Sequence, residues 1–203
     1  MSTAPKTRIT PEDYLAAERL SATRHELFDG SVVAMAGGSE AHNLISGNAL
    51  GELRNALRDR GCRVYPGDMR IRVPRTRSYF YADVSVVCGD PEFDDEKRDV
   101  LLNPLVVVET LSPSTEAYDR GEKFREYRKI PSLREYVLIS QHQPYVEVHS
   151  RCEFNRWESR FAEGLDASIE LPAVQATILL SDLYMFVSFE ESSGPPPGAV
   201  PGE

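Results

Sequence analysis

The sequence predicts one mixed α/β domain of the α+β type, and three observations support this fold class. Residues 41–57 repeat apolar side chains every three or four positions, which is typical of an amphipathic helix. Residues 62–111 are rich in β-branched and aromatic residues, which favour strands. Residues 135–161 alternate polar and apolar side chains, as the strands of a β-meander do. The length of 203 residues is in the range of one domain.

The composition is that of an ordinary globular protein, with 41% hydrophobic and 27% charged residues. It excludes disorder, collagen and a small disulfide scaffold for the chain as a whole. The net charge of −9, from 23 basic and 32 acidic residues, argues against a protein that coats DNA without specificity. A local basic groove around a metal would still admit nucleic acid, because the metal supplies positive charge.

The three cysteines, Cys62, Cys88 and Cys152, are odd in number, far apart and without a CxxC pair. This usage suits a reducing compartment and excludes a zinc site built from thiolates. The first ten residues lack the apolar stretch of a secretion signal, and the longest apolar runs are too short to cross a bilayer. We therefore expect a cytoplasmic protein of bacterial type that binds no membrane.

The N-terminal segment predicts a short helix followed by a hairpin. Thr10 is a suitable cap for a helix over about 11–20, because its hydroxyl can accept a bond from a free amide. The Asp-Gly pair at 29–30 separates two alternating apolar stretches, and this pair favours a tight hairpin turn. We expect paired strands over 24–28 and 31–36.

The helix over 41–57 is predicted to end near Gly61, and β-structure follows it. The acidic stretch at 89–99 has no apolar periodicity and is expected to be a solvated loop. The runs that favour strands on either side of it are CRVYPG, DMRIRVP, YFYADVSVV and LVVVETL.

A polar helix is predicted over 116–130, with Phe124, Tyr127 and Ile130 as its buried stripe. Pro131 ends it, because the residue before a proline avoids helical geometry.

The C-terminal part predicts the meander and then a short helix capped by Ser181. Residues 1–190 are expected to form a single domain. The Pro/Gly-rich segment 191–203 has little to bury and is expected to be a disordered tail.

Two carboxylates stand where burial is expected. Asp83 interrupts an apolar strand, on the face of Tyr81 and Ser85, and Glu109 follows three valines directly. Consecutive strands often pair, and two adjacent carboxylates suit Mg²⁺ or Mn²⁺. The alternatives are an aspartate that caps a turn at a strand end, or two independent salt bridges.

Lys123 and Tyr127 share a helix face because they are four residues apart, and Asp119 precedes Lys123 by one turn. The plain interpretation is a solvated helix with an ion pair. The functional interpretation directs Lys123 at the two carboxylates, where it would orient a water or neutralise a phosphate.

Other candidates are less specific. Glu26 lies in the first hairpin, where its plain interpretation is an exposed strand residue, and the plain interpretation of His42 is a surface or capping histidine. Arg70 and Arg72 share one face of a strand. They form either a stripe that follows phosphates or the polar face of an antiparallel sheet.

These segments together resemble the Uma-two family of endonucleases, within the restriction-endonuclease-like PD-(D/E)XK superfamily. The resemblance covers residues 10–187. It is carried by HELFDG, GSEAHNLISGNAL, VYPGDMRIRVP, YFYADVSVVC and YVLIS, and most specifically by ETLSPST and DRGEKFREYRKIPSLREY.

The resemblance implies a restriction-endonuclease-like core, with a mixed central sheet flanked by helices and an active site at one end of the sheet. It implies that Asp83 and Glu109 are the paired acids and that Glu26 is the acid of an early element. It also implies that Lys123 is a lysine carried on the following helix.

The chain departs from the family pattern at two positions. Ala82 stands where the family has the proline of Pro-Asp, which affects only the backbone. Leu111 stands where the superfamily places a lysine, so catalysis depends on Lys123 reaching the site from its helix.

The expected function is a metal-dependent endonuclease that hydrolyses phosphodiester bonds of DNA, with Mg²⁺ or Mn²⁺ as cofactor. Asp83, Glu109 and the carbonyl of Thr110 would hold the metal, with Glu26 bound through water or at a second ion. Lys123 would orient the water and Tyr127 would support Lys123, while the expected substrate contacts are His42, Arg70, Arg72 and Tyr127.

A homodimer is expected by analogy with restriction-like nucleases. Two other functions stay open: a catalytically silent nuclease-like module that binds nucleic acid or protein, and a small-molecule phosphoesterase. The leucine at 111 and the acidic balance favour the silent module. Sequence specificity and the choice between DNA and RNA also stay open.

Overall fold

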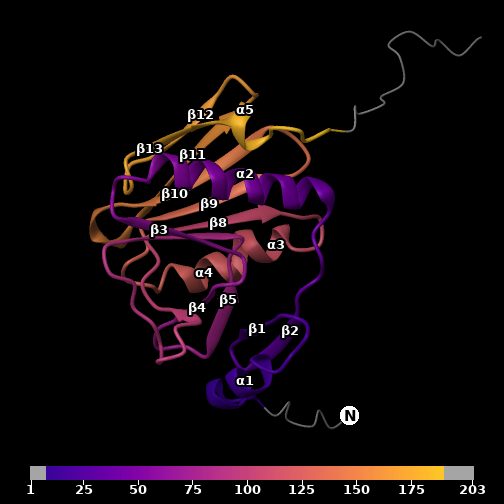
Figure 1. Cartoon of the computed structure of the whole chain (residues 1–203), viewed down its shortest axis with the longest axis vertical. Helices are drawn as coiled ribbons and strands as arrows, with labels where there is room; N and C mark the ends of the chain where they lie inside the picture. Colours follow the sequence, from indigo (N-terminus) through magenta and orange to yellow (C-terminus); the bar gives the residue numbers. More distant parts are fainter. Residues whose placement is uncertain (1–7, 190–203) are drawn as a thin grey trace, which may run out of the picture.

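Three β-sheets are present within residues 8–189, the part of the chain that the computed structural model describes. A six-stranded sheet crosses the middle of the molecule, a five-stranded sheet lies below it and a two-stranded sheet lies above (Figure 1). Helices flank these mixed sheets, so the predicted α+β class is confirmed. The tail expected over 191–203 lies outside the described residues.

The five-stranded sheet contains the predicted N-terminal hairpin. Its order is β2 (Ser31–Ala34), β1 (His25–Phe28), β5 (Ser78–Tyr81), β4 (Arg70–Val73) and β7 (Val100–Leu101). β4 and β7 run parallel, whereas the other neighbours are antiparallel. Helix α1 (Pro11–Glu18) begins after Thr10, whose side chain accepts a hydrogen bond from the Asp13 amide. Asp29 and Gly30 both have positive φ, as a tight hairpin turn requires.

The six-stranded sheet contains the strands that lead to the candidate site. Its order is β11 (Trp157–Glu163), β10 (Tyr145–Arg151), β9 (Glu135–Ser140), β8 (Val106–Leu111), β6 (Val84–Cys88) and β3 (Cys62–Pro66). β8 and β9 run parallel, and β6 pairs with β8 antiparallel. A short 3₁₀ turn, η2 (Glu153–Asn155), links β10 to β11.

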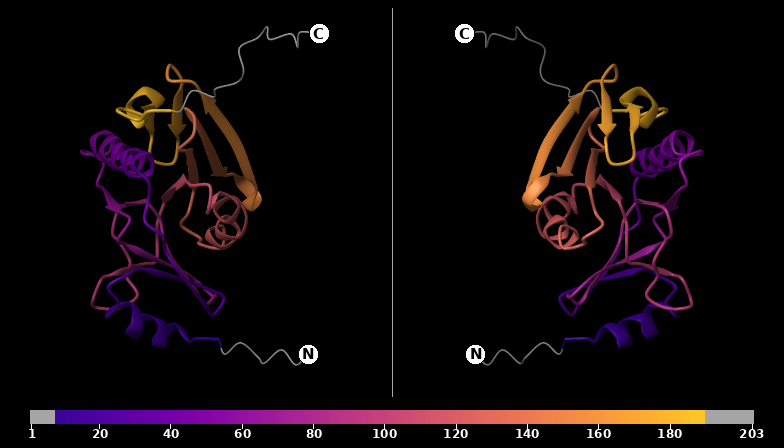
Figure 2. Two further views of the ribbon diagram at one scale, coloured as in Figure 1. Left: turned by 90° about the vertical axis from the view of Figure 1, so that its right-hand side faces the viewer. Right: turned by 90° about the vertical axis from the view of Figure 1, so that its left-hand side faces the viewer.

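The two faces of the six-stranded sheet belong to two different hydrophobic cores. One face packs on α2 (Glu40–Ala56), β12 (Ser168–Leu171), β13 (Ala176–Leu179) and α5 (Leu180–Leu183). The other packs on the segment formed by α3 (Glu116–Tyr118), the π-helix η1 (Asp119–Lys123) and α4 (Phe124–Tyr127), which lies opposite α2 (Figure 2). Val106 and Val108 therefore belong to the first core and Val107 to the second, because strand side chains alternate.

The segment expected as one strand around Asp83 is instead two strands in two sheets. β5 ends at Tyr81 in the five-stranded sheet, and β6 begins at Val84 in the six-stranded sheet. Phe80 consequently lies in one core and Val84 in the other, so the expected single strand, with Asp83 on the face of Tyr81 and Ser85, is wrong. The chain leaves one sheet for the other at Ala82 and Asp83, and a simple alternation pattern does not show such a change of sheet.

Two details of the predicted helices also differ. The segment 116–130 is helical in parts, but residues Asp119–Lys123 form a π-helix between two short α-helices. Helix α5 begins at Leu180 and has no side-chain cap, so the cap expected from Ser181 is wrong. A single wider turn and a shift of one residue are too small to be visible in an apolar pattern.

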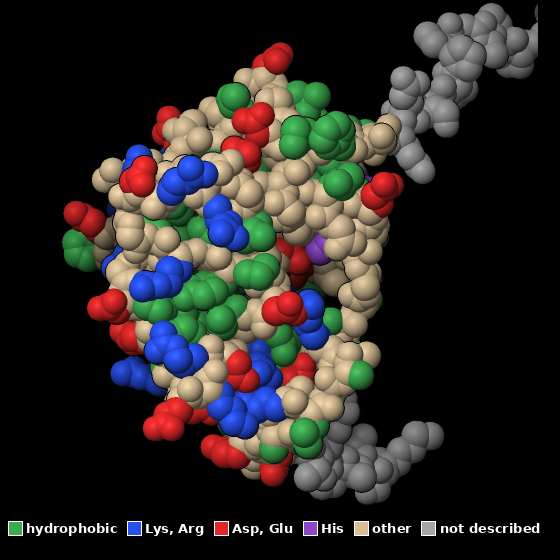
Figure 3. All heavy atoms as spheres, viewed as in Figure 1, with side chains coloured by type: hydrophobic (Ala, Val, Ile, Leu, Met, Phe, Trp, Pro, Cys, Tyr) green, Lys and Arg blue, Asp and Glu red, His purple; other side chains and the backbone are tan. Residues whose placement is uncertain are grey.

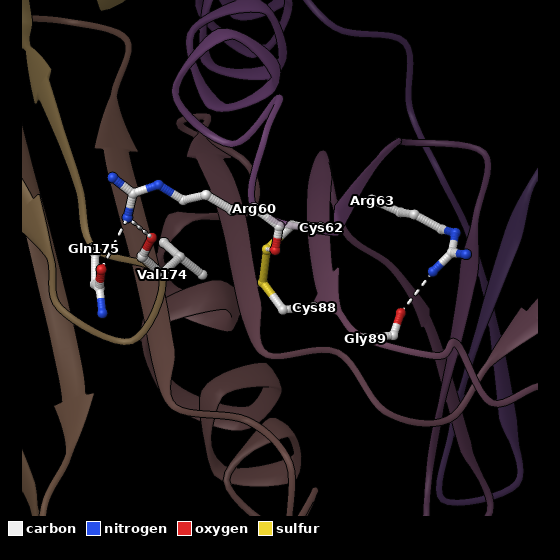
Figure 4. The surroundings of a disulfide bond; sticks show 7 residues. All are labelled: Arg60, Cys62, Arg63, Cys88, Gly89, Val174 and Gln175. Atoms are coloured by element: carbon white, nitrogen blue, oxygen red, sulfur yellow. Dashed lines mark hydrogen bonds between the residues drawn. A yellow bond between two sulfur atoms is a disulfide. The ribbon is translucent and has the colours of Figure 1, made fainter.

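A disulfide joins Cys62 to Cys88, and Cys152 is the free cysteine (Figure 4). The two cysteines occupy directly paired positions on β3 and β6, with their Cα atoms 4.0 Å apart. The interpretation of the cysteines as free thiols of a reducing compartment did not predict this pair, because the residues are 26 apart in sequence and only the strand register brings them together. Among the described residues, no helix combines the length and apolar character needed to cross a membrane.

Candidate active site

The ammonium group of Lys123 is surrounded by acidic oxygens. Its Nζ atom lies 3.0 Å from Glu26 Oε1, 3.0 Å from Glu109 Oε1 and 3.7 Å from Asp119 Oδ1. It also donates a hydrogen bond of 3.2 Å to the Tyr81 carbonyl. The exposed fractions of the Lys123, Glu26 and Glu109 side chains are 6%, 7% and 4%, so these three side chains are largely buried.

Three separate elements bring this cluster together. Glu26 comes from β1, and its Oε1 also accepts a hydrogen bond of 3.1 Å from the Tyr81 amide. Glu109 comes from β8, on the face that carries Val107 and packs toward the α3–η1–α4 segment. Lys123 ends the π-helix of that segment, so its side chain reaches back across the sheet end.

Asp83 lies beside Glu109 at the junction of the two large sheets. Val84 pairs with Val108, and the antiparallel register places Asp83 opposite Glu109. Its Oδ2 atom accepts a hydrogen bond of 2.7 Å from the Thr110 amide and lies 3.3 Å from His42 Nε2. The two predicted carboxylates are therefore neighbours, as the sequence interpretation required.

Helix α2 aims His42 at Asp83. The Ser39 side chain caps this helix by accepting a hydrogen bond of 3.1 Å from the His42 amide. The hydrogen bond with Asp83 raises the pKa of His42 above its ordinary value, although burial acts in the opposite direction. His42 thus binds Asp83 as a positively charged partner over a wider range of pH than a free histidine would.

The buried charges perturb one another strongly. Burial raises the pKa of Glu109 well above its usual range. The charge of Lys123 lowers this pKa, whereas the charges of Asp119, Asp83 and Glu26 raise it further. Burial alone would lower the pKa of Lys123, but the neighbouring carboxylates outweigh it and raise that pKa instead. Lys123 accordingly stays protonated and compensates the acidic cluster.

A cavity of about 740 Å³ opens onto this cluster. Its lining includes the predicted site residues Glu26, His42, Asp83, Glu109, Thr110 and Lys123, together with Asp119 and Glu122. A second cavity of about 730 Å³ also reaches His42 and Asp83 from the side of α2. Figure 3 shows a hollow on one face of the molecule with a histidine beside acidic side chains. The site is thus accessible and predominantly acidic.

The donor atoms at Asp83, Glu109 and Thr110 fit a hard divalent cation. Carboxylate and carbonyl oxygens are the ligands that Mg²⁺ prefers. The buried Glu109 Oε1 receives no hydrogen bond of good geometry, and its ion-pair partner is Lys123 Nζ at 3.0 Å. Among residues 8–189, no group of three or more His, Cys, Asp or Glu side chains is arranged as a metal site. Glu26 is tied to Lys123 and to the Tyr81 amide, so the fitting set is limited to the first three residues.

Three predicted contacts are not brought into the cavity. Tyr127 is fully buried beneath the cluster and packs edge-on against Phe80, so it cannot touch a substrate in this conformation. Arg70 is paired with Asp99, and Arg72 is paired with Asp94. These pairs favour the alternative interpretation of the arginines as the polar face of an antiparallel sheet.

The sequence interpretation missed two contributors to the site. Asp119 was expected only as an ion-pair partner, but it lines the cavity, and burial raises its pKa. The loop 112–115 also lines the cavity, and its Ser, Pro and Thr residues, which follow the end of β8 at Leu111, were the available signal.

Comparisons with known proteins agree with this fold. Residues 11–181 match the Uma2 family, which is described as "Putative restriction endonuclease". Two uncharacterized proteins of Synechocystis sp. are 35% and 33% identical to the chain, covering 92% and 80% of it and 96% and 92% of their own lengths.

A solved structure has the same fold. A protein of Anabaena variabilis, described as "a putative nuclease belonging to DUF820", superposes with a TM-score of 0.71 at 17% identity. The match covers 87% of this chain and 97% of that protein. Because the family match spans most of the sequence, the chain belongs to the Uma2 family, the one that its motifs resemble.

Proposed function

We propose that this protein is a metal-dependent endonuclease that hydrolyses phosphodiester bonds of DNA. The observation that carries the proposal is the position of Lys123, which lies 3.0 Å from Glu109 although it is remote from it in sequence. Membership of a family described as restriction endonucleases supports the same reaction class.

Lys123 supplies the positive charge that the superfamily pattern places two residues after the second acid. That position is Leu111, which is 2% exposed and belongs to the second hydrophobic core. Because Leu111 cannot serve, the π-helix delivers an ammonium group to the same carboxylate from the other side. In this proposal Lys123 gives Glu109 the ammonium partner that the superfamily pattern places at position 111.

The residues take separate roles in this proposal. Asp83, Glu109 and the Thr110 carbonyl would hold Mg²⁺ or Mn²⁺. When bound, the ion would lower the pKa of a water ligand and offset charge on the scissile phosphate. Lys123, kept protonated by its acidic neighbours, would orient the attacking water or a phosphate oxygen. Glu26 would hold the ammonium in position.

A nicking assay tests the proposal. Supercoiled plasmid DNA is incubated with the protein and Mg²⁺ or Mn²⁺, and relaxed and linear products are separated on a gel. Wild type is expected to convert the supercoiled form, because hydrolysis at an internal bond adds water across one P–O linkage. Glu109→Gln is expected to lose at least about 100-fold in rate, since an electrostatic ligand is removed.

Glu122→Gln is the matched control, because Glu122 also lines the cavity but takes no part in the Lys123 cluster. It should retain nearly wild-type activity. Equal loss in both variants, or nicking by wild type in excess EDTA, would contradict the proposed site.

One observation favours a second candidate, a nuclease-like module that binds nucleic acid or protein without cutting it. The charges of Glu26 and Glu109 are already compensated by Lys123 without any ion. In that case no divalent cation would bind tightly and Asp83→Ala would leave the function unchanged.

A further inference from the structure

A third cavity of about 430 Å³ adjoins the acidic site and has the opposite character. Phe28 lines both cavities. The remaining lining residues of the smaller cavity are Asp29, Arg75, Thr76, Ser78, Arg125, Glu126 and Lys129. Three of these are basic and two are acidic, and Glu126 is paired with Lys129, so the unpaired charge of the groove comes from its arginines.

The turn between β4 and β5 supplies one of the basic residues. Arg75 has a positive φ of 62°, and the Thr76 hydroxyl stabilises the turn by donating a hydrogen bond of 2.9 Å to the Val73 carbonyl. Arg75 is exposed and forms no ion pair with any residue between 8 and 189. Its positive charge is therefore available to a ligand.

The helical segment after Lys123 supplies the other two. Arg125 lies 4.0 Å from Glu122, with both side chains more than half exposed, and such a pair contributes little. Lys129 is paired with Glu126, whose Oε2 also accepts a hydrogen bond of 3.3 Å from Ser78. The Ser78 contact holds α4 against the start of β5, and the Arg75 and Arg125 side chains remain exposed to solvent.

One helical segment contributes to both cavities. Glu122 and Lys123 line the acidic cavity, and Arg125 and Lys129 of the same segment line the smaller one. A strand whose reacting phosphate lies at the cluster could reach this groove with its neighbouring phosphates.

We infer that Arg75 and Arg125 line a phosphate-binding groove that holds the nucleic-acid backbone beside the reacting bond. The inference rests on the proposed nuclease function and adds the surface that the substrate follows. The groove takes the role of phosphate contact that the sequence suggested for Arg70 and Arg72, whose charges are paired with Asp99 and Asp94. Lysine and arginine side chains of this kind bind phosphates and make affinity depend on salt.

The test compares two double charge reversals of equal magnitude. Arg75→Glu with Arg125→Glu alters the groove, and Arg54→Glu with Arg58→Glu alters two exposed arginines near the end of α2. Binding of a fluorescently labelled DNA duplex and of its single strand is followed by anisotropy over a range of salt. All four positions are exposed, and circular dichroism checks that each variant is folded.

The groove variant is expected to lose at least about 10-fold in affinity at low salt, and its salt slope should fall by about one per lost phosphate contact. The control variant should lose little. Hydrolysis of bis(4-nitrophenyl) phosphate, which has no neighbouring phosphates, should be unchanged in both variants.

Two outcomes would overturn the inference. Equal weakening in both double variants would mean that only the total charge matters, and wild-type affinity in the groove variant would mean that no phosphate binds there. If wild type binds DNA through the groove but cleaves neither DNA nor the small diester, the groove stands and the proposed hydrolysis fails.

Discussion

At the scale of single residues, the site depends on how each polar side chain is held. Asp83 is fixed through one oxygen, Oδ2, by the Thr110 amide and by His42. Both of these contacts use Oδ2, so neither of them occupies Oδ1. Outer partners of this kind orient metal-binding carboxylates, and losing them typically costs 10- to 100-fold in metal affinity.

Gly38 is the residue that leaves room for the histidine. A Cβ atom at Gly38 would lie 2.7 Å from His42 Nδ1, whereas a Cβ at Gly37 would meet nothing within 4 Å. Neither glycine has a positive φ, so alanine is compatible with the backbone at both positions. Gly38→Ala should push the ring away from Asp83 and weaken Mn²⁺ binding by about 10-fold.

Gly37→Ala is the matched control for this prediction and should leave Mn²⁺ affinity unchanged. Calorimetry gives the affinities, and NMR of the His42 ring shows whether its contact with Asp83 is lost. Identical behaviour of the two alanine variants would contradict a positioning role for His42.

The candidate residues were predictable from the sequence one at a time, and their contacts only in part. Asp83 and Glu109 are recognisable because each carboxylate interrupts an apolar run, and burying a charge requires a partner. Arg70 and Arg72 were interpreted less well. Their partners Asp94 and Asp99 lie in a segment that composition alone suggested to be a solvated loop.

At the scale of elements, β9 carries a buried carboxylate outside the candidate site. Glu135 is 1% exposed, alternates with Val137 and Ile139 toward the first core, and neither of its oxygens has a well-aligned partner. Burial raises the pKa of Glu135 to about 7. The unfolded chain releases this proton near the ordinary value of 4.5, so the folded state holds it more tightly.

Stability should therefore fall as pH rises from about 4.5 to about 7, by about 3 kcal/mol for this group. Glu135→Gln has the same shape without the charge and should remove that loss. We expect the variant to be more stable than wild type in urea denaturation at about pH 8, with a smaller difference at about pH 5.

Glu163→Gln on β11 is the control, because Glu163 is exposed. It should follow the wild-type pH dependence. If Glu135→Gln also follows it, then Glu135 is ionised without cost and the sign of this prediction is wrong.

Element boundaries show where sequence patterns stop being informative. The first hairpin follows from the Asp-Gly pair and helix α2 from its apolar spacing, and both are confirmed. The break at Ala82 and Asp83 is not visible, because the apolar pattern continues across it while the chain changes sheets. The π-helix that directs Lys123 is likewise hidden, since one wider turn barely alters the spacing.

At the scale of the whole molecule, the site forms where the two large sheets meet. β1 belongs to the five-stranded sheet and β8 to the six-stranded sheet, and the α3–η1–α4 segment lies against both (Figure 2). Glu26, Glu109 and Lys123 therefore come together only when the entire fold is assembled. The family resemblance predicted this meeting, whereas spacing alone did not. The expected homodimer stays a prediction.

In the proposed function, the acidic cluster and the groove at Arg75 would contact different parts of a polyanion. Acidic side chains dominate the cavity at Lys123, whereas the adjoining cavity has three basic side chains and two acidic ones. With a net charge of −9, the protein would hold nucleic acid better with a bound cation. The central claim is therefore that Asp83 and Glu109 bind a divalent cation.

Calorimetric titration of Mn²⁺ into wild type and into Glu109→Gln tests this claim most directly. We expect micromolar binding by wild type, about −8 kcal/mol, and no detectable binding by a variant that remains folded. Absence of binding in wild type would contradict it, as would equal binding by the two proteins. Either result would remove the catalytic interpretation of these carboxylates and leave a nuclease-shaped binding module.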